Sequence, residues 1–315
     1  MALADGRTLS FVDDDAHHDA IGAHSRLAGL GHLAIWAGLY VAGAVASLAL
    51  ATGVSEFGAR ASDWLALVAA CCLGISVYTV DRVKFADRLT DPADRFAHPE
   101  RHAFVYPHRR ALRWFAASLG AVALIAATLV HPLLAVPVLG AYLGVHLYAG
   151  WPPGPDRRRR RLKDMLVVKN LTVALSIASL CAAFLLGVRP PDGDPASMAA
   201  RMAIPFAALV SIVFADAMLC DLDDVPADRR FGTRTIPGTA SPGLTWAVAL
   251  AVQVAAGAAL VVASAALSPG FILLGVGLPL TTFVLWLVHP RRIRDIVDVR
   301  LGVLAAAALA LTHLV

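Results

Sequence analysis

The chain has 315 residues, of which 58% are hydrophobic and only 16% are charged, and its mean hydropathy is +0.68. A soluble globular domain carries about 25% charged residues, so this composition excludes an ordinary soluble domain and indicates an integral membrane protein. The formal net charge of +4 is modest, and it does not indicate a nucleic-acid-binding protein.

Residues 1–27 precede the first apolar run. They contain no apolar core of the signal-peptide type, and they carry acidic residues where such a peptide carries basic ones. We therefore expect a polar cytoplasmic tail over residues 1–27, followed by a single membrane domain over residues 28–315.

Nine apolar runs follow, each close to the roughly 20 residues that a helix needs to cross a bilayer. The sequence therefore predicts an all-α integral membrane protein, a bundle of nine transmembrane helices. The runs cover residues 30–52, 62–80, 112–131, 132–150, 164–187, 200–219, 242–267, 269–288 and 298–314.

Basic residues concentrate in every second connection between these runs. By the positive-inside rule those connections face the cytoplasm, which places the amino terminus inside the cell and the carboxyl terminus outside. The basic run at residues 157–163 is then a loop that sets the orientation beside lipid headgroups, not a nucleic-acid site. The residues in question are Arg82 to Arg110, Arg157 to Lys163, Arg229 to Arg234 and Arg291 to Arg294.

The segment "CDLDDVPADRRFGTRTIP" at residues 220–237 follows an apolar run directly. If the helix continues, Asp221, Asp224 and Asp228 fall at i, i+3 and i+7 and line one face. Like charges placed so closely repel each other, and a divalent cation would make the arrangement favourable. The segment therefore predicts a metal site.

A second acidic segment, "YTVDRVKFADRLTDPADRFAHPERHAF", begins at residue 78. Asp87 and Asp91 stand one helical turn apart, Asp94 follows a proline that should end the helix, and Asp81 points elsewhere on a regular helix. Both acidic segments lie in cytoplasmic connections, so both can reach one site.

Carboxylates and guanidinium groups around one cleft are what a Mg²⁺-bridged diphosphate requires. Mg²⁺ is held by a few carboxylates and by substrate phosphates, while arginine binds the remaining phosphate oxygens. Such a site favours ionisation of an allylic diphosphate, because the metal neutralises charge on the leaving group. The alternative is a loop of surface salt bridges, which contribute little energy.

The segment "DLDDVPADRRFGTRTIP" resembles the second aspartate motif of the UbiA superfamily of intramembrane prenyltransferases. The similarity extends over the chain from about residue 28 and includes "RRLKDMLVVKNLTVALS". It implies a helical bundle around a central intramembrane cavity and a Mg²⁺ cofactor. It also implies that Asp221, Asp224 and Asp228 help to hold Mg²⁺ and diphosphate. The matched positions are Asp221, Asp224, Asp228, Arg229, Gly232, Thr235 and Pro237.

The first motif departs from the family pattern of N-x-x-x-D-x-x-x-D. Alignment on Asp87 and Asp91 places Val83 where the family has asparagine, and "HPER" at residues 98–101 resembles a variant branch. We expect Asp87 and Asp91 to be the catalytic metal ligands of this segment, with Asp81 or Asp94 as a helper.

Polar residues within or beside the spans complete the predicted diphosphate site. Ionisable residues inside a bilayer are costly and are often functional. Lys169 can reach the diphosphate or extend to the headgroups, and Tyr78 can stabilise a cation or belong to the interfacial aromatic belt. His146, Tyr142 and Tyr148 are weaker candidates. The predicted diphosphate-binding residues are Lys169, Asn170, Arg101, Arg229, Arg234 and Tyr78.

These observations favour a Mg²⁺-dependent prenyltransferase of the cell inner membrane, with its active site on the cytoplasmic face. It would move an isoprenyl group from an isoprenyl diphosphate to a hydrophobic acceptor, aromatic or lipid-like, among membrane lipids. A terpene cyclase of the same fold is the first alternative. A transporter or a non-catalytic lipid-binding relative is less favoured, because charge gathers at one face and not at mid-membrane.

Overall fold

The computed structural model describes residues 35–54, 56–85, 87, 92–149, 165–189, 195–263, 269–288 and 293–314. Within these ranges the chain is helical and contains no strand. The expected tail at residues 1–27, the basic run at residues 157–163 and Asp91 lie outside the described residues.

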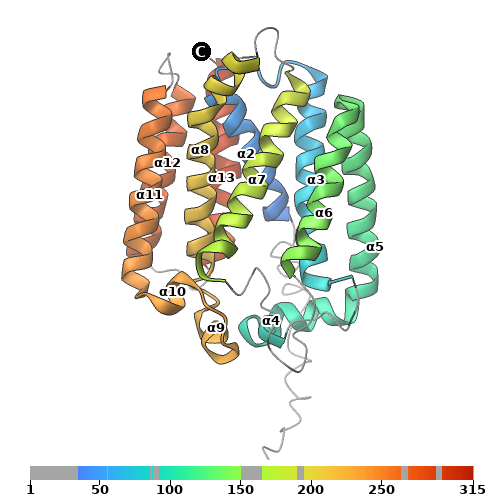
Figure 1. The fold of residues 1–315 in the computed structure, drawn as a ribbon, viewed down its shortest axis with the longest axis vertical. Helices are drawn as coiled ribbons and strands as arrows, with labels where there is room; N and C mark the ends of the chain where they lie inside the picture. Colours follow the sequence, from blue (N-terminus) through green and yellow to red (C-terminus); the bar gives the residue numbers. More distant parts are fainter. Residues whose placement is uncertain are drawn as a thin grey trace, which may run out of the picture.

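The long helices stand side by side in one bundle (Figure 1), and each coincides with an apolar run of the sequence. Five of the described helices are long and apolar enough to cross a membrane, namely α3, α5, α7, α8 and α11. An integral membrane helical protein is thereby confirmed, whereas the count of nine spans stays a prediction. The bundle comprises α2 (Trp36–Ala51), α3 (Ala61–Val83), α5 (Pro99–Val130), α6 (Ala135–Ala149), α7 (Leu166–Val188), α8 (Pro195–Cys220), α11 (Pro242–Ala263), α12 (Pro269–Val288) and α13 (Ile293–Leu314).

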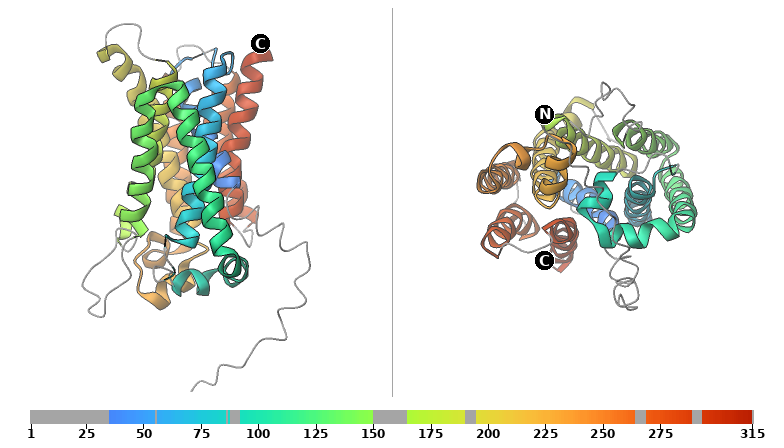
Figure 2. Two further views of the ribbon diagram at one scale, coloured as in Figure 1. Left: turned by 90° about the vertical axis from the view of Figure 1, so that its right-hand side faces the viewer. Right: turned by 90° about the horizontal axis from the view of Figure 1, so that it is seen from below.

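Glycine contacts allow α2 to lie centrally, packed against α3, α7 and α13 (Figure 2). A Cβ atom on Gly43 would lie 2.7 Å from the Cα atom of Gly302, and one on Gly38 would lie 2.7 Å from the carbonyl oxygen of Cys71. Helices in lipid gain from such close approach, since dispersion contacts replace the hydrophobic effect between them.

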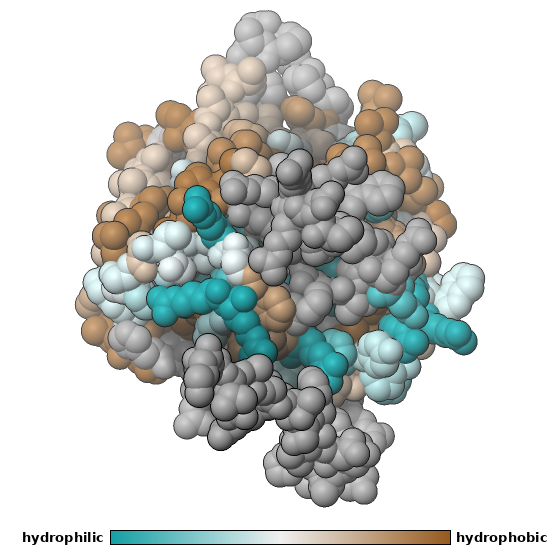
Figure 3. Space-filling view, turned by 60° about the horizontal axis from the view of Figure 1, so that its bottom comes forward, coloured by the Kyte–Doolittle hydropathy of each residue, from teal (hydrophilic) through white to brown (hydrophobic). Residues whose placement is uncertain are grey.

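Apolar side chains cover the flanks of the bundle, and hydrophilic residues gather near one end (Figure 3). Trp114 and Leu129, both on α5, are 76% and 70% exposed. An exposed apolar flank suits a bilayer, in which lipid tails cover it.

Three short helices lie at the end of the bundle where α3 and α8 end and where α5, α7 and α13 begin, which we call the site end (Figure 1). They are α4 (Pro92–Ala97), α9 (Val225–Phe231) and α10 (Ile236–Thr239). The rings of Phe96 and Phe231 meet edge to face at 6.1 Å, and the Arg230 guanidinium lies 4.6 Å from the Phe96 centroid. The two acidic segments therefore meet at one end of the bundle, as the sequence predicts.

Candidate functional site

The second acidic segment is not one continuous helix, so its three aspartates do not line one helix face as expected. Helix α8 ends at Cys220, a turn follows, and α9 begins at Val225. The break has a local cause, because Pro226 lacks the N–H that would bond the carbonyl of Leu222 in a continuous helix. The turn places Asp221 and Asp224 before α9 and Asp228 within it.

Asp221 is almost fully buried and pairs with Lys169 from the first turn of α7. The ammonium nitrogen lies 2.6 Å from Asp221 Oδ1, and the aspartate side chain is 4% exposed. The other oxygen, Oδ2, is buried and has no hydrogen-bond partner in the described part of the chain. Oδ1 of this carboxylate is thus paired with Lys169, and Oδ2 is available to a ligand.

Asp224 lies between two cationic or polar partners. His98 Nε2 lies 2.7 Å from Asp224 Oδ1, and Arg294 Nη2 donates to Oδ2 at 2.7 Å. Burial by itself would raise the pKa of Asp224, but the guanidinium of Arg294 and the hydrogen bond with His98 hold that pKa well below its ordinary value. Burial lowers the pKa of His98, which favours the neutral imidazole. Asp224 is therefore a firmly ionised carboxylate.

Asp228 has a raised pKa, in contrast to Asp224. Burial, with a smaller contribution from the negative charges of Asp221 and Asp224, raises the pKa of Asp228 to about 6, although Lys169 and a hydrogen bond with Thr235 act to lower it. The side chain is 7% exposed, and its Oδ2 is buried without a partner among the described residues. This carboxylate is the one that an added cation would stabilise most.

These carboxylates fit a divalent metal. Buried polar atoms are nearly always bonded, so the two open oxygens of Asp221 and Asp228 indicate a missing ligand. Within the described ranges, no three acidic, histidine or cysteine side chains are placed to hold a metal ion by themselves. Mg²⁺ commonly takes one or two carboxylates and completes its shell with water and substrate phosphate. Both side-chain polar atoms of Asn170 are also buried without a described partner.

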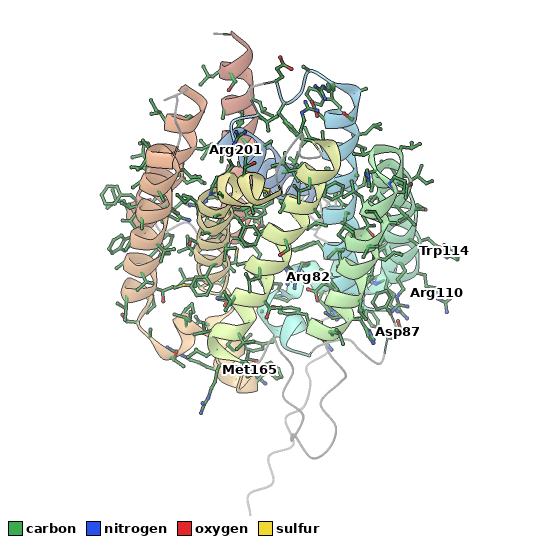
Figure 4. All side chains as sticks on the ribbon, turned by 45° about the horizontal axis from the view of Figure 1, so that its top comes forward. Arg82, Asp87, Arg110, Trp114, Met165 and Arg201 are labelled. Carbon is green, nitrogen blue, oxygen red and sulfur yellow. The ribbon has the colours of Figure 1, made fainter. Side chains whose placement is uncertain are left out.

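The structure does not bring Asp87 into this group. Asp87 accepts hydrogen bonds from Arg109 Nε at 3.1 Å and from Arg113 Nη2 at 2.6 Å, and its side chain is 54% exposed. Those bonds lower the pKa of Asp87. In Figure 4 it lies near the edge of the bundle with Arg110 and Trp114, whereas Arg82 lies within the bundle.

The early end of α3 explains this placement. Helix α3 stops at Val83, and Lys84 has a positive φ of 52°, so Asp87 does not continue the helix. The proline at residue 92 also begins α4 and does not end a helix as expected. The metal roles of Asp87 and Asp91 stay predictions, since Asp91 lies outside the described residues.

Among the described aspartate side chains of the first acidic segment, Asp81 is the one that shares surroundings with the second segment. Its Oδ1 accepts a hydrogen bond from Lys84 at 2.7 Å. Tyr148 on α6 lies within electrostatic range of Asp81, Asp221 and Lys169 together. The sequence singled out Asp81 only as a helper.

Basic and aromatic groups border the carboxylates. The guanidinium of Arg82 lies 4.8 Å from the ring centroid of Tyr78, and Arg82 and Arg101 also line a pocket at the site end. Three arginines in one pocket suit phosphate oxygens, which guanidinium groups bind bidentately. Arg229 and Arg234, which the sequence predicts to bind diphosphate, are exposed and do not line this pocket. The pocket is lined by Arg82, Val83, Arg101, His102, Val105, Tyr106 and Arg109.

Two residues that contact Asp224 were not among the predicted site residues. Arg294 and His98 both contact Asp224, from α13 and from the residue before α5. The sequence offered partial signals, since Arg294 precedes an apolar run and His98 begins "HPER". Their partner could not be read from the sequence, because Arg294 is 70 residues and His98 is 126 residues away from Asp224.

Comparisons with known proteins identify the fold. No protein-family model matches the chain, and no curated protein matches it in sequence. The apo structure of a UbiA homolog from Aeropyrum pernix K1 superposes with a TM-score of 0.62 and 14% identity, over 86% of this chain and 96% of that one. A UbiA homolog from Archaeoglobus fulgidus bound to GPP and Mg²⁺ gives a TM-score of 0.57 and 13% identity, over 90% and 98%. The chain therefore has the fold of the UbiA superfamily.

Proposed function

We propose that the chain is a Mg²⁺-dependent intramembrane prenyltransferase, which moves an isoprenyl group from an isoprenyl diphosphate to an aromatic or lipid-like acceptor. The observation that carries the proposal is the pair of buried, unpartnered carboxylate oxygens of Asp221 and Asp228 beside Lys169. The fold supports it, because structures of the Archaeoglobus fulgidus homolog contain GPP or DMAPP together with Mg²⁺.

Asp221, Asp224 and Asp228 would hold the metal, with Asp81 on the facing segment. Bound there, Mg²⁺ would neutralise the negative charge that develops on the leaving diphosphate. Lys169, which bonds Asp221 Oδ1, would also bind a phosphate oxygen, while Asp221 Oδ2 would bind the metal. Arg82, within the bundle, presents further donors to the phosphates.

The reaction breaks the bond between the allylic carbon and the diphosphate oxygen, and the diphosphate leaves with the electron pair. A nucleophilic atom of the acceptor then bonds to that carbon and releases a proton. The ring of Tyr78 offers a face that stabilises a nearby cation. The surrounding apolar helices exclude water, which would otherwise capture the carbocation.

The proposal also includes the topology of the protein. We propose that nine helices span the cell inner membrane and that the site end and the amino terminus both face the cytoplasm. The support is the distribution of basic connections. Reporter fusions at residues 95, 158 and 230 should read cytoplasmic, and fusions at 57 and 192 should read external. A reversed reporter at residue 95 or 230 would contradict the orientation.

The function is tested with purified protein in lipid nanodiscs, geranyl diphosphate, Mg²⁺ and a host lipid extract, with products identified by mass spectrometry. Prenylated product should appear only with Mg²⁺ and acceptor, and it should disappear in Asp221→Asn. A cyclic product formed without acceptor would favour the cyclase alternative. Unchanged turnover in Asp221→Asn and Asp228→Asn would exclude the assigned site.

A further inference from the structure

A polar network lies deeper in the bundle than the metal site and joins five helices. Asp216 on α8 accepts hydrogen bonds from Tyr40 at 2.9 Å and from Gln253 at 2.7 Å, and Arg300 donates to the same carboxylate. Arg300 also donates to Thr282, and Thr282 donates to Gln253. All five side chains are 7% exposed or less.

The ion pair of this network is satisfied within the chain, although Arg300 Nε is buried without a hydrogen-bond partner among the described residues. Both oxygens of Asp216 are bonded, and the charge of Arg300 is paired. Yet a buried ion pair is costly, since desolvation of the two ions can exceed their attraction. The best-attested role of such buried polar groups is to fix the register between packed helices.

Helix α13 forms polar contacts with α8 in its first part, at Arg294, Asp298 and Arg300, and small side chains follow. Its sequence "LGVLAAAALAL" presents small side chains, which allow close approach but form shallow ridges and grooves. Gly302 fixes the contact with α2, where a Cβ atom would lie 2.9 Å from the carbonyl oxygen of Leu39. Against α8, α13 makes polar contacts through Arg294, Asp298 and Arg300, and Val297 packs with Ala215 and Leu219 in an apolar cluster.

Helices α8 and α13 also lead to the metal site, because Asp224 follows the end of α8 and Arg294 lies at the start of α13. Arg294 precedes Arg300 by six residues, about 9 Å of helix rise, and reaches the carbonyl of Cys220 at 3.2 Å and the carboxylate of Asp224 at 2.7 Å. A slip of one residue would move Arg294 by about 1.5 Å and rotate it by about 100°. The short contact with Asp224 would then be lost.

We propose that Asp216 and Arg300 are positioning residues, which hold α13 in register with α8 so that Arg294 reaches Asp224. The role of this register in catalysis rests on the proposed function. The existence of the register does not depend on that function, because the alignment of α8 with α13 can be measured without an activity assay.

Native Cys220 supplies a reporter of the register. Its Sγ lies 4.0 Å from Asp298 Oδ1 on α13, so the substitution Asp298→Cys places a second thiol opposite it. The other three cysteines, Cys71, Cys72 and Cys181, are replaced by alanine. Oxidative cross-linking between residues 220 and 298, followed by mass spectrometry, then reports whether the two helices keep their native register.

The test compares this reporter with and without the pair Asp216→Asn and Arg300→Met. Removal of both charges leaves no uncompensated ion, so the fold is expected to persist. Cross-linking should slow about tenfold. In the native-cysteine background, the Mg²⁺ concentration for half-maximal thermal stabilisation with inorganic diphosphate should rise about tenfold, as expected for loss of a charged hydrogen bond.

The pair Asp63→Asn and Arg189→Met is the matched control, because it removes a 2.9 Å ion pair between the start of α3 and the residue after α7, at the end of the bundle opposite the site end. Both readouts should stay native in that variant. Native cross-linking in the Asp216→Asn and Arg300→Met variant would overturn the register. Slow cross-linking with native Mg²⁺ dependence would overturn its link to Asp224. An absence of prenyl transfer in the native protein would refute the proposed function and leave the cross-linking result standing.

Discussion

Substitution of Asp228 by asparagine should stabilise the ligand-free protein while abolishing its activity. In the fold, burial and the neighbouring carboxylates raise the pKa of Asp228 to about 6, whereas an unfolded aspartate has a pKa near 3.9. Below about pH 4 both states are protonated, and the carboxylate costs nothing. As pH rises from about 4 to 6 the unfolded state ionises first, so the free energy of unfolding falls.

The full penalty is present above about pH 6. A difference of about 2 pKa units corresponds to at most about 3 kcal/mol, and solvent screening reduces it to about 1–2 kcal/mol. Asparagine carries no charge and escapes this penalty. The variant should therefore exceed the native protein in stability at pH 7.5, and the difference should shrink as the pH falls toward 4.5.

Thermal unfolding in nanodiscs between pH 4.5 and 8 measures this difference, with and without Mg²⁺ and inorganic diphosphate. Mg²⁺ should stabilise the native protein above pH 6 but stabilise the variant weakly, because a metal-bound carboxylate must be ionised. Asp87→Asn is the matched control, since the pKa of Asp87 is lowered and its removal should give no gain. An Asp228→Asn protein less stable than native at pH 7.5 would refute the reasoning.

The remaining predictions concern single contacts of the site. Lys169→Met leaves Asp221 buried without its cation and should cost about 3–5 kcal/mol of stability, read from thermal unfolding; native stability would contradict the ion pair. Arg82→Ala should weaken binding of inorganic diphosphate about tenfold by calorimetry, while Arg229→Ala, which removes an exposed arginine, should change it little. Asp224, whose pKa is held low, contributes stability that is present above about pH 4 and lost on further acidification; Arg294→Met should remove that contribution.

The sequence by itself determined the helices and the chemistry of the site. Apolar runs of bilayer length locate the long helices to within about five residues at most ends, because hydrophobicity and helix geometry are local properties; α5 is the exception, since it begins at Pro99, well before its apolar run. The spacing of Asp221, Asp224 and Asp228 predicts a cation site, and the cost of a charge inside a span predicts a role for Lys169; both stay predictions.

Only the tertiary structure decided which groups meet. Asp87 was a plausible ligand by spacing, but α3 ends at Val83 and Arg113 holds Asp87 near the edge of the bundle. Arg294 joins Asp224 across 70 residues because the two lie on neighbouring elements of the bundle. Such contacts depend on helix register and crossing, which arise from packing between distant segments and are not encoded in local periodicity.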